Sequence, residues 1–282
     1  MDAPLRLGFS PCPNDTFVFH ALVHGAVAPE LRFDVRLEDV ETLNAWAERG
    51  ELDVAKVSYH AFGHIADRWW MLPAGGALGR GVGPLIVARD PDTPLEGARI
   101  ATPGGRTTAN LLLDLAAPGR VERTVMRYDR ILPAVAEGRV DAGLIIHESR
   151  FTYAEHGLVE RMDLGAWWER ETGAPIPLGG IAVRRDLPEA TVGRLAEALR
   201  DSVRAAWADP EASADYVARH AQEMSADVRR RHIDTYVGAF TLDVGEEGRA
   251  AARTLFERAS ARGLLPAVPQ RPFWGDAPGG AG

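Results

Sequence analysis

Apolar and polar positions along the first part of the chain predict strands that alternate with helices. Residues 5–9 are apolar enough for a short buried strand, and residues 17–24 continue as a mainly apolar helix after a proline-containing break. Every second position from 31 to 37 is apolar, which is the pattern of a half-buried strand. Residues 40–49 then fit a helix ended by a glycine, and residues 52–58 fit another strand. This β-α-β-α-β order is typical of an α/β sheet with crossover helices.

The same order recurs further along the chain. A strand at residues 98–101 runs into a small, polar turn at 102–108, much as the first strand runs into residues 10–16, and an apolar helix follows in both places. A second matched pair, residues 48–55 and 137–143, comes later in the same order. We therefore expect two lobes of similar topology, with chance similarity between β-α-β units as the alternative.

Two glycine-flanked apolar segments, residues 83–89 and 178–185, are the expected crossings between the lobes. The prediction is an α/β protein with a discontinuous first lobe of residues 1–88 plus 183–282 and an inserted second lobe of residues 89–182. The two crossing strands would form a hinge beside a central cleft. After the second crossing the pattern is nearly all helical, over residues 188–207, 210–221, 226–240 and 245–262.

Two features are left open by the pattern. The segment after residue 265 is rich in Pro, Gly and Ala and predicts extended chain, with the order of the part beyond Trp274 undecided. The aromatic pairs Trp69-Trp70 and Trp167-Trp168 fit either core packing or the interface of a homodimer.

Composition and charge narrow the class of protein. With 46% hydrophobic and 26% charged residues, the chain resembles an ordinary globular protein, and it has no apolar run long enough to span a bilayer. The net charge of −8 argues against a non-specific nucleic-acid binder, because such proteins need a basic face. A single cysteine, Cys12, excludes a disulfide framework within the chain and a multi-cysteine metal site. The first residues show no secretory signal, so we expect a cytoplasmic protein without nucleic-acid or membrane partners.

The basic residues are all arginine with one exception, Lys56. It lies within the apolar segment 52–58, which is a poor place for a solvated side chain. A compact ammonium fits tight, partly buried positions that a planar guanidinium does not. We interpret Lys56 as functional, with chance survival of one lysine as the alternative.

Ligands of α/β sheets bind beyond the carboxyl ends of the strands. Two facing lobes would bring residues 10–16, 56–60, 102–108 and 147–150 to one cleft. Their free N–H groups, hydroxyls and one ammonium suit an anionic or polyhydroxylated small molecule. The residues that offer these groups are Ser10, Asn14, Lys56, Ser58, Thr107 and Thr108. Helix capping is the alternative explanation for any one of these hydroxyls.

A fully apolar strand that ends abruptly in histidine and glutamate marks residues 143–150. A neutral imidazole on His147, just past a buried strand, is placed to act as a general base. Glu148 either orients that ring or caps Arg150. No dinucleotide fingerprint, P-loop, G-x-S-x-G elbow or H-E-x-x-H helix occurs, so we expect no metal ion and no cofactor.

The other histidines carry weaker signals. His60 and His64 follow the strand of Lys56 and can approach the cleft. Structural roles are expected for the histidines in polar helical or loop contexts, which are His24, His156, His220 and His232.

Four motifs resemble those of a known family. They are LGFSPCPNDTF at residues 7–17, LEDVETLN at 37–44, GGALGRGVGP at 75–84 and GLIIHESRFTY at 143–153. In these motifs the chain resembles the 1,4-dihydroxy-6-naphthoate synthase family, and the likeness extends to about residue 265. The resemblance implies a two-lobed fold like that of type 2 periplasmic binding proteins and a role in the futalosine route to menaquinone.

The activity implied by this resemblance is that of a carbon–carbon lyase. Its substrate would be a carboxylated aromatic fused to a sugar-derived ring, cyclic dehypoxanthinylfutalosine. The products would be 1,4-dihydroxy-6-naphthoate and a three-carbon fragment, dihydroxyacetone, formed without a cofactor. His147 matches the family's proposed base, and Lys56-Val57-Ser58 and Thr107-Thr108 match its substrate contacts.

Two other functions are compatible with the same fold. One is a small-carboxylate binding protein, which the missing export signal disfavours. The other is the sister chorismate dehydratase of the same pathway, against which the histidine motif argues.

Overall fold

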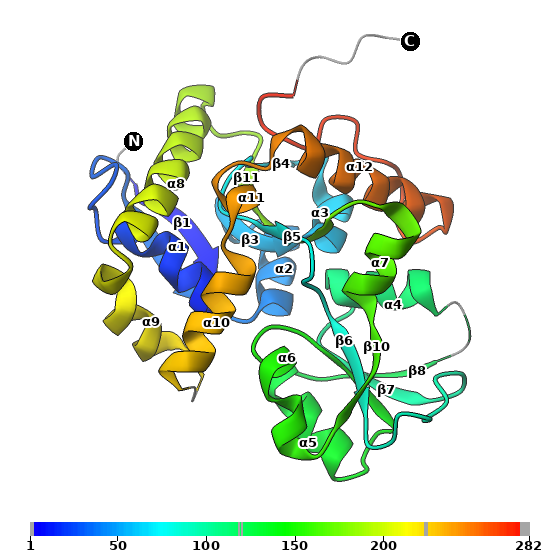
Figure 1. The fold of residues 1–282 in the computed structure, drawn as a ribbon. Coiled ribbons are helices and arrows are strands. Elements are labelled where there is room, and N and C mark those ends of the chain that lie inside the picture. Colours follow the sequence, from blue (N-terminus) through cyan, green and yellow to red (C-terminus); the bar gives the residue numbers. More distant parts are fainter. Residues whose placement is uncertain (1–2, 118, 120, 223–224, 277–282) are drawn as a thin grey trace.

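The computed structural model describes residues 3–117, 119, 121–222 and 225–276, which form two lobes, one above the other in Figure 1. The strands are β1 (Leu5–Phe9), β2 (Phe33–Leu37), β3 (Val54–Ser58), β4 (Trp69–Met71), β5 (Ala77–Gly79), β6 (Leu85–Ala88), β7 (Arg99–Thr102), β8 (Glu122–Val125), β9 (Ala142–Ile145), β10 (Val159–Asp163) and β11 (Ile176–Arg184). The α-helices are α1 (Pro13–Val23), α2 (Val40–Arg49), α3 (Tyr59–Ile65), α4 (Thr108–Ala116), α5 (Ile131–Ala136), α6 (Ser149–Thr152), α7 (Leu164–Thr172), α8 (Glu189–Ala208), α9 (Ala214–His220), α10 (Ala226–Tyr236), α11 (Ala239–Leu242) and α12 (Gly245–Ala261).

Each lobe is built on one mixed sheet. The sheet of lobe 1 has the order β2-β1-β3-β11-β4, with β5 also paired to β11, and that of lobe 2 has the order β10-β6-β9-β7-β8. In lobe 1, β1 pairs in parallel with β2 and β3, and in lobe 2, β7 pairs in parallel with β8 and β9. Antiparallel β11 and β6 then lie beside β3 and β9, respectively. The expected repeat of one β-α-β-α-β unit is therefore confirmed by the strand order.

The chain passes between the lobes at slightly different places from those expected. β6 belongs to the sheet of lobe 2, and all of β11 belongs to that of lobe 1. The expected boundaries at residues 88 and 183 thus move to the segment before β6 and to the start of β11. The reason is that β6 and β11, which these apolar segments form, each pair with strands of one lobe only.

Local sequence explains where several elements begin and end. Asp39 caps α2 by accepting hydrogen bonds from the N–H groups of Glu41 and Thr42. The expected end of that helix at Gly50 is confirmed, because this residue adopts a left-handed φ of 73°. β4, β5 and β10 carry no clear alternating pattern and were not predicted.

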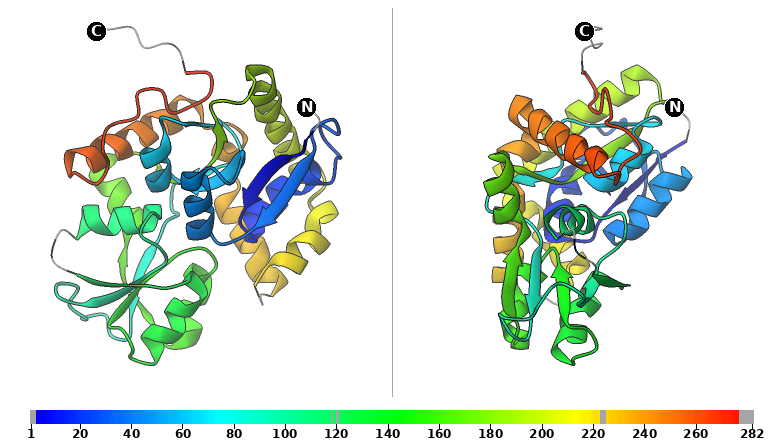
Figure 2. Two further views of the ribbon diagram at one scale, coloured as in Figure 1. Left: turned by 180° about the vertical axis from the view of Figure 1, so that it is seen from behind. Right: turned by 90° about the vertical axis from the view of Figure 1, so that its right-hand side faces the viewer.

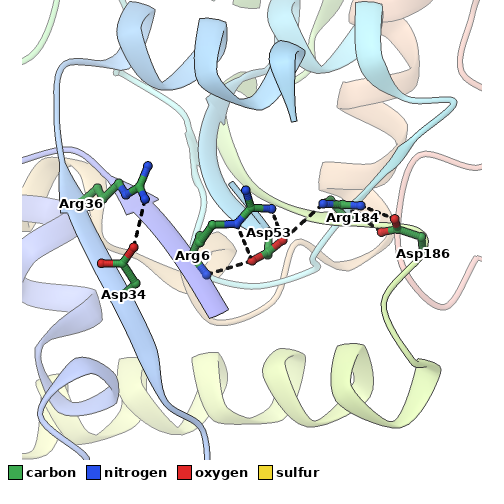
Figure 3. Close-up of polar contacts among 6 residues, drawn as sticks. All are labelled: Arg6, Asp34, Arg36, Asp53, Arg184 and Asp186. Atoms are coloured by element: carbon green, nitrogen blue, oxygen red, sulfur yellow. Dashed lines mark hydrogen bonds and ion pairs between the residues drawn. The ribbon is translucent and has the colours of Figure 1, made fainter. Parts of the chain in front are cut away.

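A chain of ion pairs joins three elements of lobe 1 at the amino-terminal end of its parallel strands (Figure 3). The guanidinium of Arg6 on β1 donates to both carboxylate oxygens of Asp53, at 3.0 and 2.6 Å. Arg184, the last residue of β11, reaches the same carboxylate at 3.4 Å and also pairs with Asp186. Burial works against ionisation of Asp53, yet the hydrogen bonds from Arg6 hold its pKa below the usual value. This network stabilises the end of the lobe 1 sheet that lies away from the site described below.

The segment after α12, drawn in red in Figure 2, stays on lobe 1. Phe273 pairs with Met71 beside β4 and is buried. This part of the expected extended tail is therefore held in place by backbone pairing, and residues 277–282 lie outside the described residues. Trp69 and Trp168 are buried in the core. Among the described helices, none is long and apolar enough to cross a bilayer.

Candidate functional site

A narrow cavity lies between the two lobes, with about 80 Å³ of space for the centres of water-sized molecules. Ser10 follows β1, Ser58 ends β3, Thr107 follows the turn after β7, and His147 follows β9, and all of them line this cavity. The site thus lies at the carboxyl ends of the parallel strands of both lobes, as the sequence predicted.

Asp15 is the centre of the polar wall that lobe 1 contributes. One carboxylate oxygen accepts hydrogen bonds from the Ser10 hydroxyl at 2.7 Å and the Ser10 backbone N–H at 3.3 Å. The other accepts from the Asn14 amide at 2.8 Å and from the Lys56 ammonium at 2.5 Å. Asp15 and Lys56 are 2% and 6% exposed, so this ion pair is almost fully buried. Asp15 lies in the first turn of α1, where the helix dipole also favours a negative charge.

This pairing changes the interpretation of Lys56. The ammonium was expected to meet a carboxylate or hydroxyl group of a ligand, and the carboxylate beside it in the structure belongs to the protein itself. One N–H donor goes to Asp15, and no residue in the described ranges accepts from the other two. Lys56 therefore lines the cavity as a cation with a counterion, still able to donate to a neutral or anionic oxygen of a ligand.

The three residues 56–58 on β3 do not share one face. Lys56 and Ser58 line the cavity, whereas Val57 points into the hydrophobic core and is fully buried. Successive side chains of a strand point to opposite faces, so Val57 points away from the face that Lys56 and Ser58 share. The resemblance to the family concerned the whole segment 56–58 and did not distinguish the two faces. Ser58 is held by Asn44, whose amide exchanges hydrogen bonds with the Ser58 backbone N–H (2.9 Å) and hydroxyl (3.2 Å).

The amino terminus of α4 forms the wall opposite α1. Thr107 caps the helix by accepting from the N–H of Asn110, so its hydroxyl serves the fold as well as lining the cavity. The first helical residues, Thr108 and Ala109, also line the cavity, and N–H groups at these positions have no acceptor within a helix. Such a terminus favours an anionic group.

His60 approaches the site from behind this helix. Its backbone N–H lies 3.4 Å from the Thr108 hydroxyl and its ring lies 3.2 Å from the Thr107 carbonyl oxygen. Burial lowers the pKa of His60 to about 4, so the ring is neutral. His64, one turn further on, contacts the guanidinium of Arg106 at 2.7 Å. Both rings thus join the lobes beside the cavity, and neither lines it.

His147 enters the cavity from lobe 2 through a strained turn. Its φ of 57° is left-handed, which is uncommon for a residue other than glycine. The edge of Tyr128 packs on the imidazole with ring centroids 5.1 Å apart. Burial lowers the pKa of His147 to about 4, with smaller opposing effects of Asp15 and Lys56. The ring is therefore a neutral base at physiological pH, and it keeps a partly exposed surface towards the cavity.

Glu148 plays neither of the two roles considered for it. Arg150 instead bonds to the Gly83 carbonyl at 2.8 Å and to Asp163 at 2.7 Å. The Glu148 carboxyl is buried, its Oε2 has no hydrogen-bond partner among the described residues, and burial raises its pKa. The ring that packs on His147 is that of Tyr128, and no hydrogen bond among the described residues joins Glu148 to the imidazole.

His232 was expected to be structural, but it lines the cavity from α10. It is fully buried, and its Nε2 lies 2.9 Å from the Asn14 carbonyl oxygen. Its ring is nearly parallel to that of His147, with centroids 6.3 Å apart and an angle of 17° between the planes. Sequence reasoning missed this residue because residues 14 and 232 are far apart in the chain and only the packing of α10 on α1 joins them.

Other wall residues were missed, among them Tyr236 and the backbone at Gly179, and Asp15 was expected in a segment at the cleft but not singled out. Asp15 could have been singled out as an acidic residue within a buried, apolar helix. In the described part of the chain, no three His, Cys, Asp or Glu side chains gather in a way that would hold a metal ion.

Taken by itself, this arrangement defines a two-lobed protein of the periplasmic-binding-protein-like class. The alkanesulfonate-binding protein of Xanthomonas axonopodis has the same fold, with a TM-score of 0.74, 17% identity and coverage of 96% of this chain and 98% of that one. A solved protein from Archaeoglobus fulgidus is more similar, with a TM-score of 0.89, 38% identity and coverage of 93% and 98% of the two chains.

Residues 5–261 match the family model described as menaquinone biosynthesis, and the chain belongs to this family. Two curated relatives carry the name 1,4-dihydroxy-6-naphtoate synthase. The one from Thermus thermophilus is 58% identical over 269 residues, covering 95% of this chain and 98% of its own. The one from Streptomyces coelicolor is 53% identical over 269 residues, covering 94% and 95%. The family suggested by the sequence motifs is thereby confirmed.

Proposed function

We propose that this chain is a 1,4-dihydroxy-6-naphthoate synthase that cleaves cyclic dehypoxanthinylfutalosine in menaquinone biosynthesis. The observation that carries the proposal is the neutral imidazole of His147, which faces the buried Asp15–Lys56 pair across the cavity. The near full-length similarity to two enzymes of that name supports it.

The substrate has a carboxylated aromatic part and a sugar-derived part, and the cavity has two matching ends. The carboxylate binds at the amino terminus of α4, where Thr108 and Ala109 offer backbone N–H groups. The hydroxyls bind near Ser10, Asn14 and Ser58 on the side of lobe 1. Asp15 already balances the charge of Lys56. The Lys56 ammonium then stabilises an oxygen of the substrate that gains negative charge during the reaction.

The chemistry needs removal of a proton, cleavage of a carbon–carbon bond and aromatisation. Neutral His147 takes the proton, and the Lys56 ammonium stabilises the resulting oxyanion. The carbon–carbon bond then breaks, and the proton held by His147 passes to the three-carbon fragment, which leaves as dihydroxyacetone. The bicyclic part loses a proton as it becomes aromatic, while the leaving fragment takes one up. The two products together contain the atoms of the substrate, so no oxidant is consumed. A positioned base should contribute roughly 10²–10⁴-fold to the rate.

Purified protein incubated with cyclic dehypoxanthinylfutalosine, and separately with chorismate, tests the proposal by mass spectrometry of the products. We expect 1,4-dihydroxy-6-naphthoate and dihydroxyacetone in equal amounts from the first substrate and no reaction of the second. Conversion of chorismate alone would instead identify the sister dehydratase. Binding of the first compound without turnover would identify a carrier protein.

A further inference from the structure

His232 is a buried titratable group in the cavity wall that the chemistry above does not use. It is 0% exposed, and it is held from both lobes. Asn14 of lobe 1 bonds to its Nε2 at 2.9 Å, while the rings of His147 and Phe151 of lobe 2 both lie 6.3 Å from it between centroids. Such a ring has a fixed position and a fixed orientation.

The hydrogen-bond chain beside it also fixes which ring nitrogen carries the proton. The Asn14 amide must direct its NH₂ group to the Asp15 carboxylate, because turning the amide over would place two oxygens against each other. The Asn14 oxygen therefore faces His232 and accepts from Nε2–H. Burial and the nearby His147 and Lys56 lower the pKa of His232, so its other nitrogen, Nδ1, carries a bare lone pair.

That lone pair lacks a partner. No residue in the described ranges donates a hydrogen bond to Nδ1, although the atom is buried. A buried polar atom without a partner destabilises the folded state, so folded proteins rarely keep one without a use. The side chain that carries it lines the cavity next to Asn14 and Asp15.

We propose that His232 is a substrate-binding residue whose Nδ1 accepts a hydrogen bond from a hydroxyl of the sugar-derived part of the substrate. This inference rests on the proposed function. It assigns the hydroxyl-bearing end of the substrate to lobe 1, beside Asn14, and leaves proton abstraction to His147. The ligand hydroxyl donates the hydrogen bond that no described residue donates to this nitrogen.

Two substitutions separate binding through Nδ1 from a merely structural role. In His232→Gln the side-chain amide reaches the position of Nε2 and keeps the bond to Asn14, but no acceptor remains at the position of Nδ1. In His232→Asn the amide reaches the position of Nδ1, and the bond to Asn14 is lost. His156→Gln, at an exposed position, is the matched control.

We expect His232→Gln to lower kcat/KM for cyclic dehypoxanthinylfutalosine by tenfold or more, with a melting temperature close to that of the wild type. His232→Asn should retain more of the activity, and His156→Gln all of it. Wild-type kcat/KM in His232→Gln, or a greater loss in His232→Asn, would overturn the inference and leave the proposed function intact. A wild-type protein that does not turn over this compound would overturn both.

A spectroscopic measurement covers the case in which His232→Gln does not fold. In His147→Asn protein labelled with ¹⁵N-histidine, the substrate should persist because the base is missing. Its addition should move the Nδ1 resonance of His232 towards that of a hydrogen-bonded nitrogen. A resonance that stays in place at saturation would overturn the inference.

Discussion

Loss of the whole buried ion pair of Asp15 and Lys56 should lower the activity strongly and the stability only slightly, whereas loss of either partner alone should lower both. Both side chains are nearly inaccessible to solvent, and the ammonium nitrogen lies 2.5 Å from the carboxylate. Removing one partner of such a pair leaves an uncompensated buried charge, which costs about 3–5 kcal/mol. We therefore expect Asp15→Asn and Lys56→Met each to lower the free energy of unfolding by about that amount.

The double variant Asp15→Asn/Lys56→Met should be more stable than either single variant. It buries no net charge, and the amide introduced at position 15 can still bond to Ser10. Replacing a buried pair by uncharged groups is often neutral, so we expect a loss of about 1–2 kcal/mol and a coupling energy of about 3 kcal/mol or more. At about 2 °C per kcal/mol, the single variants should melt about 6–10 °C below the wild type.

Urea and thermal unfolding of the wild type, the two single variants and the double variant measure these changes in stability, and kcat/KM measures the activity. The exposed pair of Arg230 and Asp234 on α10 is a matched control, and Asp234→Asn should cost about 0.3–0.5 kcal/mol. The double variant should be well folded yet at least about a hundredfold less active, because it lacks the ammonium that we propose stabilises an oxyanion. Single variants within about 1 kcal/mol of the wild type, or a double variant whose loss is their sum, would refute the reasoning.

Three further predictions follow from other contacts. Because burial lowers the pKa of His147 to about 4, kcat/KM should stay nearly constant from about pH 7.5 to 5.5, whereas a base with the usual pKa near 6.5 would lose about tenfold. Asp53→Asn should destabilise the protein by about 1.5–3 kcal/mol at pH 7. Since the folded-state pKa of Asp53 is lowered, this difference in urea midpoints should shrink as the pH falls through about 4 and below; a constant difference would contradict the assignment. Gly179→Ala would place a methyl group 3.1 Å from Cε of Lys56. We expect this variant to lose about 1–3 kcal/mol of unfolding free energy and to have a lower kcat/KM. Gly193→Ala is the control, because its methyl group meets nothing within 4 Å, and it should be neutral or stabilising.

The sequence pattern was sufficient for the parts of the site that follow strands. The period of apolar residues located β1, β3, β7 and β9, and the rule that ligands bind at the carboxyl ends of strands brought Ser10, Ser58, Thr107 and His147 to one cavity. The paired topology of the two lobes also followed, because both halves repeat the same order of elements.

The pattern could not reveal which polar groups satisfy one another. Asp15 lies in the first turn of α1, after β1, and Lys56 lies on β3, and their pairing depends on the parallel register of these two strands. Likewise, His232 reaches Asn14 only because α10 packs on α1, and no local signal marks a contact over that distance in the chain. Val57 was assigned to the site because a segment match takes no account of which face of a strand each residue occupies.

The turnover of His147→Asn with cyclic dehypoxanthinylfutalosine tests the central claim most directly. Asparagine keeps a polar group of similar reach but cannot act as a base near neutral pH. The account predicts that kcat falls by roughly 10²-fold or more, while the affinity for the substrate, measured by calorimetry, stays within about tenfold. An unchanged kcat would remove His147 from the mechanism, and with it the neutral imidazole on which the proposed reaction depends.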